Sequence, residues 1–82
     1  MKVLFRKQKS GDIIAILPDE HSHVVNEIAT YESSIGFDHA NYDLLLEQTK
    51  PCSEEEYYEL LDELEEHYNL KLQILTRLNK QV

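Results

Sequence analysis

The sequence predicts a small α+β domain, in which one long and one short helix cover a mostly antiparallel sheet. Three observations support this. Ser53–Tyr68 has the periodicity of an amphipathic helix, two β-branched or alternating stretches flank Gly11, and a third alternating stretch, Leu70–Leu78, follows the helix. The expected order is β-β-β-α-α-β, arranged as a two-layer sandwich. At 82 residues, the chain is expected to form a single domain, 1–82.

The long helix carries the clearest pattern. Its apolar side chains recur at positions i, i+3, i+4, i+7 and i+11, which places them on one face of a helix. They are Tyr57, Leu60, Leu61, Leu64 and Tyr68. Ser53 is expected to cap the first turn, and Glu56 can reach back to the Ser53 N–H to complete a capping box. Asn69 is expected to end the helix.

The first two strands are expected at Lys2–Gln8 and Asp12–Leu17. Side chains alternate in the first, whereas the second is apolar nearly throughout and is expected to be more fully buried. Gly11 lies between them, where a hairpin turn needs a residue that tolerates positive φ. Pro18 ends the second strand because proline cannot donate to a ladder.

Three further elements are expected. Val25–Glu32 favours a strand because of its Thr-Tyr pair, although a helix remains an alternative. Asp38–Gln48 indicates a short helix with Asp38 as its N-cap. Leu70–Leu78 is expected to be the last strand, with Leu70, Leu72 and Ile74 facing inward and Leu75 outward.

The outer face of the long helix is strongly acidic. No Lys or Arg occurs within Ser53–Tyr68, so no i,i+4 ion pair can offset repulsion inside the helix. The face is either a solvated surface or a docking surface for a basic protein partner. The candidate partner-binding residues are Tyr58, Glu59, Asp62, Glu63 and Glu66. Tyr31 and Tyr42 could extend that surface, since tyrosine favours interfaces, or could line the core.

The net charge of −8 disfavours nucleic acid and anionic membranes as general partners. Basic residues nevertheless occur in the first and last expected strands. If these strands are neighbours, Arg6, Lys7, Lys71 and Arg77 could form an anion patch that binds nucleic acid. The alternative is that they are ordinary outward-facing strand residues.

Other chemistry has weak support in the sequence. His21 and His23, with His39 further along, could contribute to a small metal- or ligand-binding site, but no Cys/His spacing typical of zinc occurs. No nucleophile motif or phosphate loop is present, so we expect neither an enzyme nor a cofactor. A homodimer is an alternative mode of association, because a chain of this size buries a small core.

The expected location is the cytoplasm. Cys52 is the only cysteine, so an intramolecular disulfide cannot form. The longest apolar run, Ile13–Leu17, is too short to cross a membrane.

Two blocks of the sequence resemble a known family. The first comprises Val3–Lys7 and Lys9–Ala15 and ends at Pro18; the second comprises Thr49–Pro51 and Glu55–Tyr57 and continues to Leu64. They are similar to small uncharacterised proteins encoded by gut Bacteroidales and by their phages and mobile elements. The resemblance implies the same order of elements and a bacterial or phage setting. The family brings no assigned activity. The function that we expect is a non-enzymatic interaction module, which could act as an accessory or inhibitory protein of a phage or mobile element.

Overall fold

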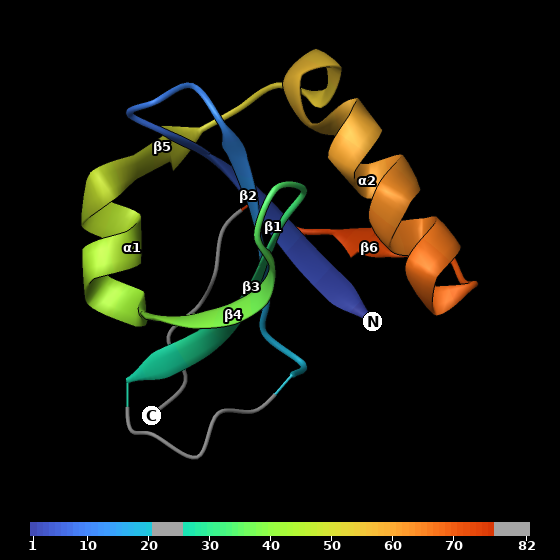
Figure 1. Cartoon of the computed structure of the whole chain (residues 1–82), viewed down its shortest axis with the longest axis horizontal. Helices are drawn as coiled ribbons and strands as arrows, with labels where there is room; N and C mark the ends of the chain where they lie inside the picture. The colour runs from blue at the N-terminus through green and yellow to red at the C-terminus, as the bar shows by residue number, and fades with distance from the viewer. Residues whose placement is uncertain (21–25, 77–82) are drawn as a thin grey trace.

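The structure is a computed structural model that describes residues 1–20 and 26–76 (Figure 1). Within these residues the chain forms six strands and two helices. They are β1 (Lys2–Gln8), β2 (Ile13–Leu17), β3 (Glu27–Glu32), β4 (Gly36–Asn41), α1 (Tyr42–Gln48), β5 (Thr49–Pro51), α2 (Glu54–Tyr68) and β6 (Gln73–Ile74). The predicted α+β class is therefore confirmed, but the order contains two strands, β4 and β5, that were not predicted.

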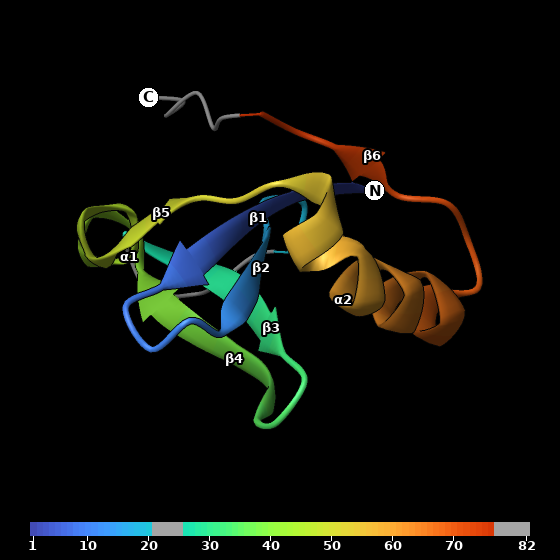
Figure 2. The ribbon, with the colours of Figure 1, turned by 90° about the horizontal axis from the view of Figure 1, so that it is seen from above.

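The sheet is a mostly antiparallel meander of order β4-β3-β2-β1-β5. On the side of β1 away from β2, β5 pairs with Arg6–Gln8 and β6 pairs in parallel with Lys2–Val3 (Figure 2). The first and last strands are thus neighbours, which is the condition that the candidate anion patch required. β1 therefore pairs with three strands, with β2 on one side and with β5 and β6 on the other.

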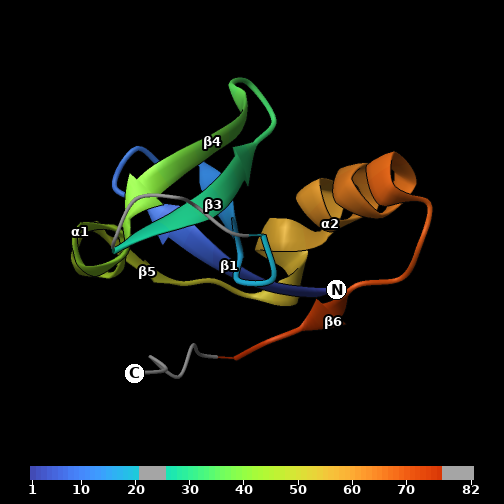
Figure 3. The same cartoon turned by 90° about the horizontal axis from the view of Figure 1, so that it is seen from below.

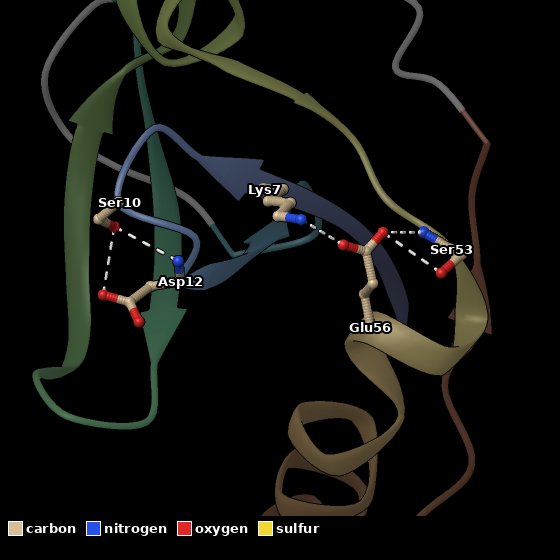
Figure 4. Close-up of polar contacts among 5 residues, drawn as sticks. All are labelled: Lys7, Ser10, Asp12, Ser53 and Glu56. Carbon is tan, nitrogen blue, oxygen red and sulfur yellow. Dashed lines mark hydrogen bonds and ion pairs between the residues drawn. The ribbon is translucent and has the colours of Figure 1, made fainter.

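The predicted hairpin joins β1 to β2. Gly11 has φ +97°, a left-handed conformation that glycine adopts without a Cβ penalty, and its N–H donates to the Gln8 carbonyl (2.9 Å). The Ser10 hydroxyl accepts from the Asp12 N–H (3.3 Å) and donates to the Asp12 carboxylate (3.2 Å) (Figure 4). These local bonds explain why this turn could be predicted from sequence.

Both faces of β1 and β2 are buried. Val3, Phe5, Ala15 and Leu17 pack toward α2, where they surround its buried residues. The intervening side chains, among them Leu4, Ile14 and Ile16, point to the opposite face and pack with Leu45 of α1. Coverage on both sides explains why β2 is apolar along its whole length.

The two helices therefore lie on opposite faces of the sheet (Figure 3). This corrects the predicted sandwich, in which both helices covered one face. α1 connects β4 at one edge of the sheet to β5 at the other, and in doing so it crosses the face away from α2. Neither helix within the described ranges is long and apolar enough to cross a membrane.

The prediction of a helix at Asp38–Gln48 is wrong in its first part. Residues 38–41 belong to β4, which pairs with β3 from Glu27↔Asn41 to Glu32↔Gly36. The helix begins at Tyr42, and its N-cap is Asn41, whose side chain accepts from the Leu44 N–H (3.0 Å). Gly36, with φ +91°, allows the chain to reverse and pair. Pairing with β3 therefore overrides the local helix pattern.

The last strand is also shorter than expected, at Gln73–Ile74. Leu70 is 45% exposed and does not face inward, whereas Leu72 is buried, as predicted. Leu75, expected to face outward, packs against the cluster on the α1 side. Asn69, in a left-handed conformation, ends α2, and the Glu65 carboxylate accepts from the Leu72 N–H (2.9 Å).

α2 agrees closely with the prediction. Leu60 and Leu64 are buried, while Tyr57, Leu61 and Tyr68 pack partly buried against the same core. The Tyr57 ring stacks on Phe5, with centroids 4.5 Å apart and planes inclined by 9°. Aromatic stacking of this kind adds to the burial of apolar area and fixes the first turn of α2 on β1.

Ser53 and Glu56 form the predicted capping box (Figure 4). The Ser53 N–H donates to Glu56 Oε1 (3.0 Å), and Glu56 Oε2 also forms an ion pair with Lys7 Nζ (2.6 Å). These contacts, led by the bond from Lys7, lower the pKa of Glu56 from 4.5 to about 2.

This lowered pKa predicts an acid-dependent loss of stability. The Glu56 contribution should be complete above about pH 4.5 and should disappear as the pH falls toward about 2, because protonation weakens its contacts. Thermal unfolding of the wild type and of Glu56→Gln across this range checks it. The wild type should be the more stable protein at pH 7, and the two should converge at low pH. A constant difference would show that the charge of Glu56 contributes nothing.

Candidate functional site

The outer face of α2 is the candidate site. Tyr58 is 56% exposed, and Glu59, Asp62 and Glu66 are also exposed. Tyr58, predicted to lie off the buried stripe, does so. The three carboxylates follow at i, i+3 and i+7, so they share one side of the helix and span about 10 Å along its axis.

Glu63 has a different role from the other candidate residues. It is partly buried and accepts hydrogen bonds from the Tyr31 hydroxyl and from the Ser33 hydroxyl (3.0 Å). The bond to Glu63, together with burial, raises the pKa of Tyr31. Glu63 thus fastens the start of the β3–β4 turn to α2. Tyr31 is held by this bond, and Tyr42 begins α1, so neither joins Tyr58 in one patch.

Two cations lie against α2. Lys7 pairs with Glu56 near the start of the helix, and Lys71 approaches Glu65 near its end (3.6 Å). No ion pair or hydrogen bond joins the side chains of Glu59, Asp62 and Glu66 to any other residue within 1–20 and 26–76. The centre of the face is therefore left with uncompensated negative charge.

A groove extends this negative surface toward the sheet. It has a volume of about 300 Å³ and lies between α2 and the ends of β2 and β3. Asp12 and Glu32 line it together with Glu56, Glu59 and Glu63. Asp12 and Glu32 could not be predicted as part of this surface, because only the packing of α2 on the sheet brings them beside the helix.

The three described residues of the candidate anion patch, Arg6, Lys7 and Lys71, are not gathered in one place. Arg6 donates to the carbonyls of Leu46 (3.2 Å) and Thr49 (2.8 Å), which makes it a structural residue. Lys7 and Lys71 contact glutamates nine positions apart in α2, about 13 Å along its axis. Arg77 lies outside the described residues.

A different basic group occurs at the hairpin end of β1. Lys7 stands directly opposite Lys50 of β5, and both line a groove of about 370 Å³ with Lys9 and Gly11. Sequence reasoning missed Lys50 because β5 is defined only by its pairing with β1. Glu47 lines the same groove and, with Glu56 on Lys7, offsets part of its positive charge.

The structure describes only part of the candidate metal-binding site. His21 and His23 lie outside the described residues, and His39 is exposed on β4. Within the described part of the chain, no three His, Cys, Asp or Glu side chains are grouped as metal ligands would be. Cys52 is partly buried, and this burial raises the pKa of its thiol, so it is not an activated thiolate.

An aromatic cluster that the sequence did not predict joins β4 to the end of α2. The Phe37 ring lies 4.6 Å from Tyr31, 5.0 Å from His67 and 6.0 Å from Tyr68, measured between centroids. Phe37 is 47% exposed although it lies within a strand. Residues thirty positions apart in the sequence meet here, and no local pattern indicates that.

Comparison of the chain with protein-family models, with curated proteins and with solved structures finds no match.

Proposed function

We propose that the chain is a non-enzymatic protein-binding module whose α2 binds a positively charged segment of another protein. One observation carries the proposal. Glu59, Asp62 and Glu66 form an exposed row on α2, and no cation among residues 1–20 and 26–76 pairs with them. Tyr58, beside this row and more than half exposed, supplies the aromatic contact that is common in interfaces.

The helix that carries the row is anchored on the sheet. Leu60 and Leu64 anchor the buried side of α2, and the capping box fixes its first turn. A basic segment that meets this face therefore finds carboxylates whose spacing is set by the helix backbone, so that only their side chains must be ordered on binding. Complementary charge also favours rapid association and specificity for a basic partner.

The biological setting of the proposal is a bacterial cytoplasm, where the chain would act as an accessory or inhibitory protein of a phage or mobile element. This part rests on the resemblance of residues 3–18 and 49–64 to proteins of such elements. Nucleic acid fits the same surface poorly, because phosphates would be repelled by the carboxylates.

The triple variant Glu59→Lys, Asp62→Lys, Glu66→Lys tests the proposal. We expect it to remain folded, because all three side chains are exposed. It should capture at least tenfold less of a protein partner from host extract than the wild type does. Reversal of three contact charges replaces attraction with repulsion, which costs more than the 1.4 kcal/mol that corresponds to tenfold. Quantitative mass spectrometry of tagged proteins measures the captured amount.

A matched pair of single variants provides the control. Glu66→Lys and Glu47→Lys change the net charge equally, and both residues are exposed in helices, but Glu47 belongs to α1. Only Glu66→Lys should weaken capture. Equal capture by the wild type and the triple variant, with all proteins folded, would refute the role of the acidic face.

A further inference from the structure

An aromatic pocket lies near the C-terminal end of α2. It has a volume of about 320 Å³ and lies between the end of α2 and β4. The rings of Phe37, His67 and Tyr68 line it, together with the carboxylate-bearing residues Asp38 and Glu20. His67 directly follows Glu66, and successive helix residues point about 100° apart, so the pocket lies around the helix from the last carboxylate of the acidic row.

The three rings form a corner rather than a flat stack. The Phe37 ring is inclined by 50° to His67 and by 74° to Tyr68, and the rings of His67 and Tyr68 are perpendicular. Because an aromatic face carries negative potential, rings that meet at steep angles can contact one cation from more than one side. Phe37, nearly half exposed, leaves ring surface for such a contact.

The polar groups of the pocket favour a cation over an apolar or anionic ligand. Asp38 is exposed and uses Oδ1 to accept from the His39 N–H (2.8 Å), which leaves Oδ2 for a ligand. The Tyr68 hydroxyl donates to Glu20 (3.4 Å), which holds that carboxylate at the pocket. The same negative charges, in a chain with net charge −8, disfavour occupation by a second copy.

We infer that this pocket receives one arginine or lysine side chain of the basic segment that binds α2. The inference rests on the proposed function and adds a specific anchor to it. The side chain would place its cation against the ring of Phe37 and near Asp38, while the rest of the segment runs along Glu66 and Asp62. A partner would thus need a cation at a defined position as well as a high positive charge.

Binding of a defined probe tests the inference. The probe is an alanine-based helical peptide of sixteen residues with arginines at i, i+3 and i+7 and a fourth arginine one turn further. A second peptide replaces the fourth arginine with citrulline, which keeps the shape of the side chain but removes its charge. Calorimetry measures affinity, and NMR follows the ring protons of Phe37, His67 and Tyr68.

We expect the arginine peptide to shift the ring resonances and to bind about three- to thirtyfold more tightly than the citrulline peptide. Phe37→Leu keeps an apolar side chain but removes the ring. It should remove most of the difference in affinity between the arginine and citrulline peptides. Leu44→Ala, which truncates an exposed side chain on α1 outside both the pocket and the acidic face, should preserve that difference. Unfolding temperatures of both variants establish that they remain folded.

The outcomes separate the two proposals. If Glu59→Lys, Asp62→Lys, Glu66→Lys abolishes binding while Phe37→Leu has no effect and the two peptides bind equally, the pocket inference fails and the acidic face stands. If the arginine peptide binds the wild type and the triple variant equally, or binds neither, the proposed function fails and the pocket inference fails with it.

Discussion

Replacement of Leu64 with alanine should lower the free energy of unfolding by about 3 kcal/mol. Leu64 is fully buried at the centre of α2 and packs in one cluster with Val3, Phe5 and Leu17. Truncation removes buried methyl groups and leaves a cavity that the surrounding strands can fill only in part. Because a domain of this length has a total stability of roughly 4–12 kcal/mol, the loss should be evident in urea denaturation.

Leu44→Ala is the control for this experiment. The chemical change is the same and the residue also lies in a helix, but Leu44 is 52% exposed on α1. It should change stability by no more than about 0.5 kcal/mol. Similar losses for the two variants would contradict the position of α2 on the sheet.

Replacement of Arg6 with methionine should cost about 2 kcal/mol of stability. The Arg6 guanidinium donates to the Thr49 hydroxyl (3.0 Å) and to the carbonyls of Leu46 and Thr49. These bonds join β1 to the end of α1, where helix carbonyls lack partners within the helix and a cation is favourable. Methionine retains the apolar stem but removes every donor.

Lys9→Met removes the same charge from the same hairpin at an exposed position. Chemical denaturation should show a change within about 0.5 kcal/mol for this variant. If Arg6→Met were equally mild, Arg6 would be a surface cation, and the anion patch suggested by the sequence would regain support.

The elements that could be predicted are those with local causes. α2 follows from the spacing of Leu60 and Leu64 and from the Ser53 capping box, and the first hairpin follows from Gly11. β4 and β5 could not be predicted, because they become strands only by pairing with β3 and β1. At Asp38 the local sequence led to a wrong prediction: the residue is suited to a helix N-cap, but it lies in β4.

In the candidate site too, some features could be predicted from local sequence and others could not. The exposure of Tyr58 and the acidic row follows from helical periodicity alone. The bond from Tyr31 to Glu63 and the ring contacts of Phe37 with His67 depend on how β3 and β4 meet α2. Such contacts join residues about thirty positions apart, for which a single sequence contains no spacing rule.

Affinity purification of the tagged protein from its host, with and without nuclease, would decide whether the chain is a protein-binding module. We expect a basic protein to be recovered in stoichiometric amount and to remain bound after nuclease treatment. Recovery of nucleic acid, or of proteins that nuclease removes, would contradict a protein-binding module and direct attention to the lysines around Lys50. Recovery of the tagged chain with only its own untagged copies would contradict it as well, because the partner would then be the protein itself.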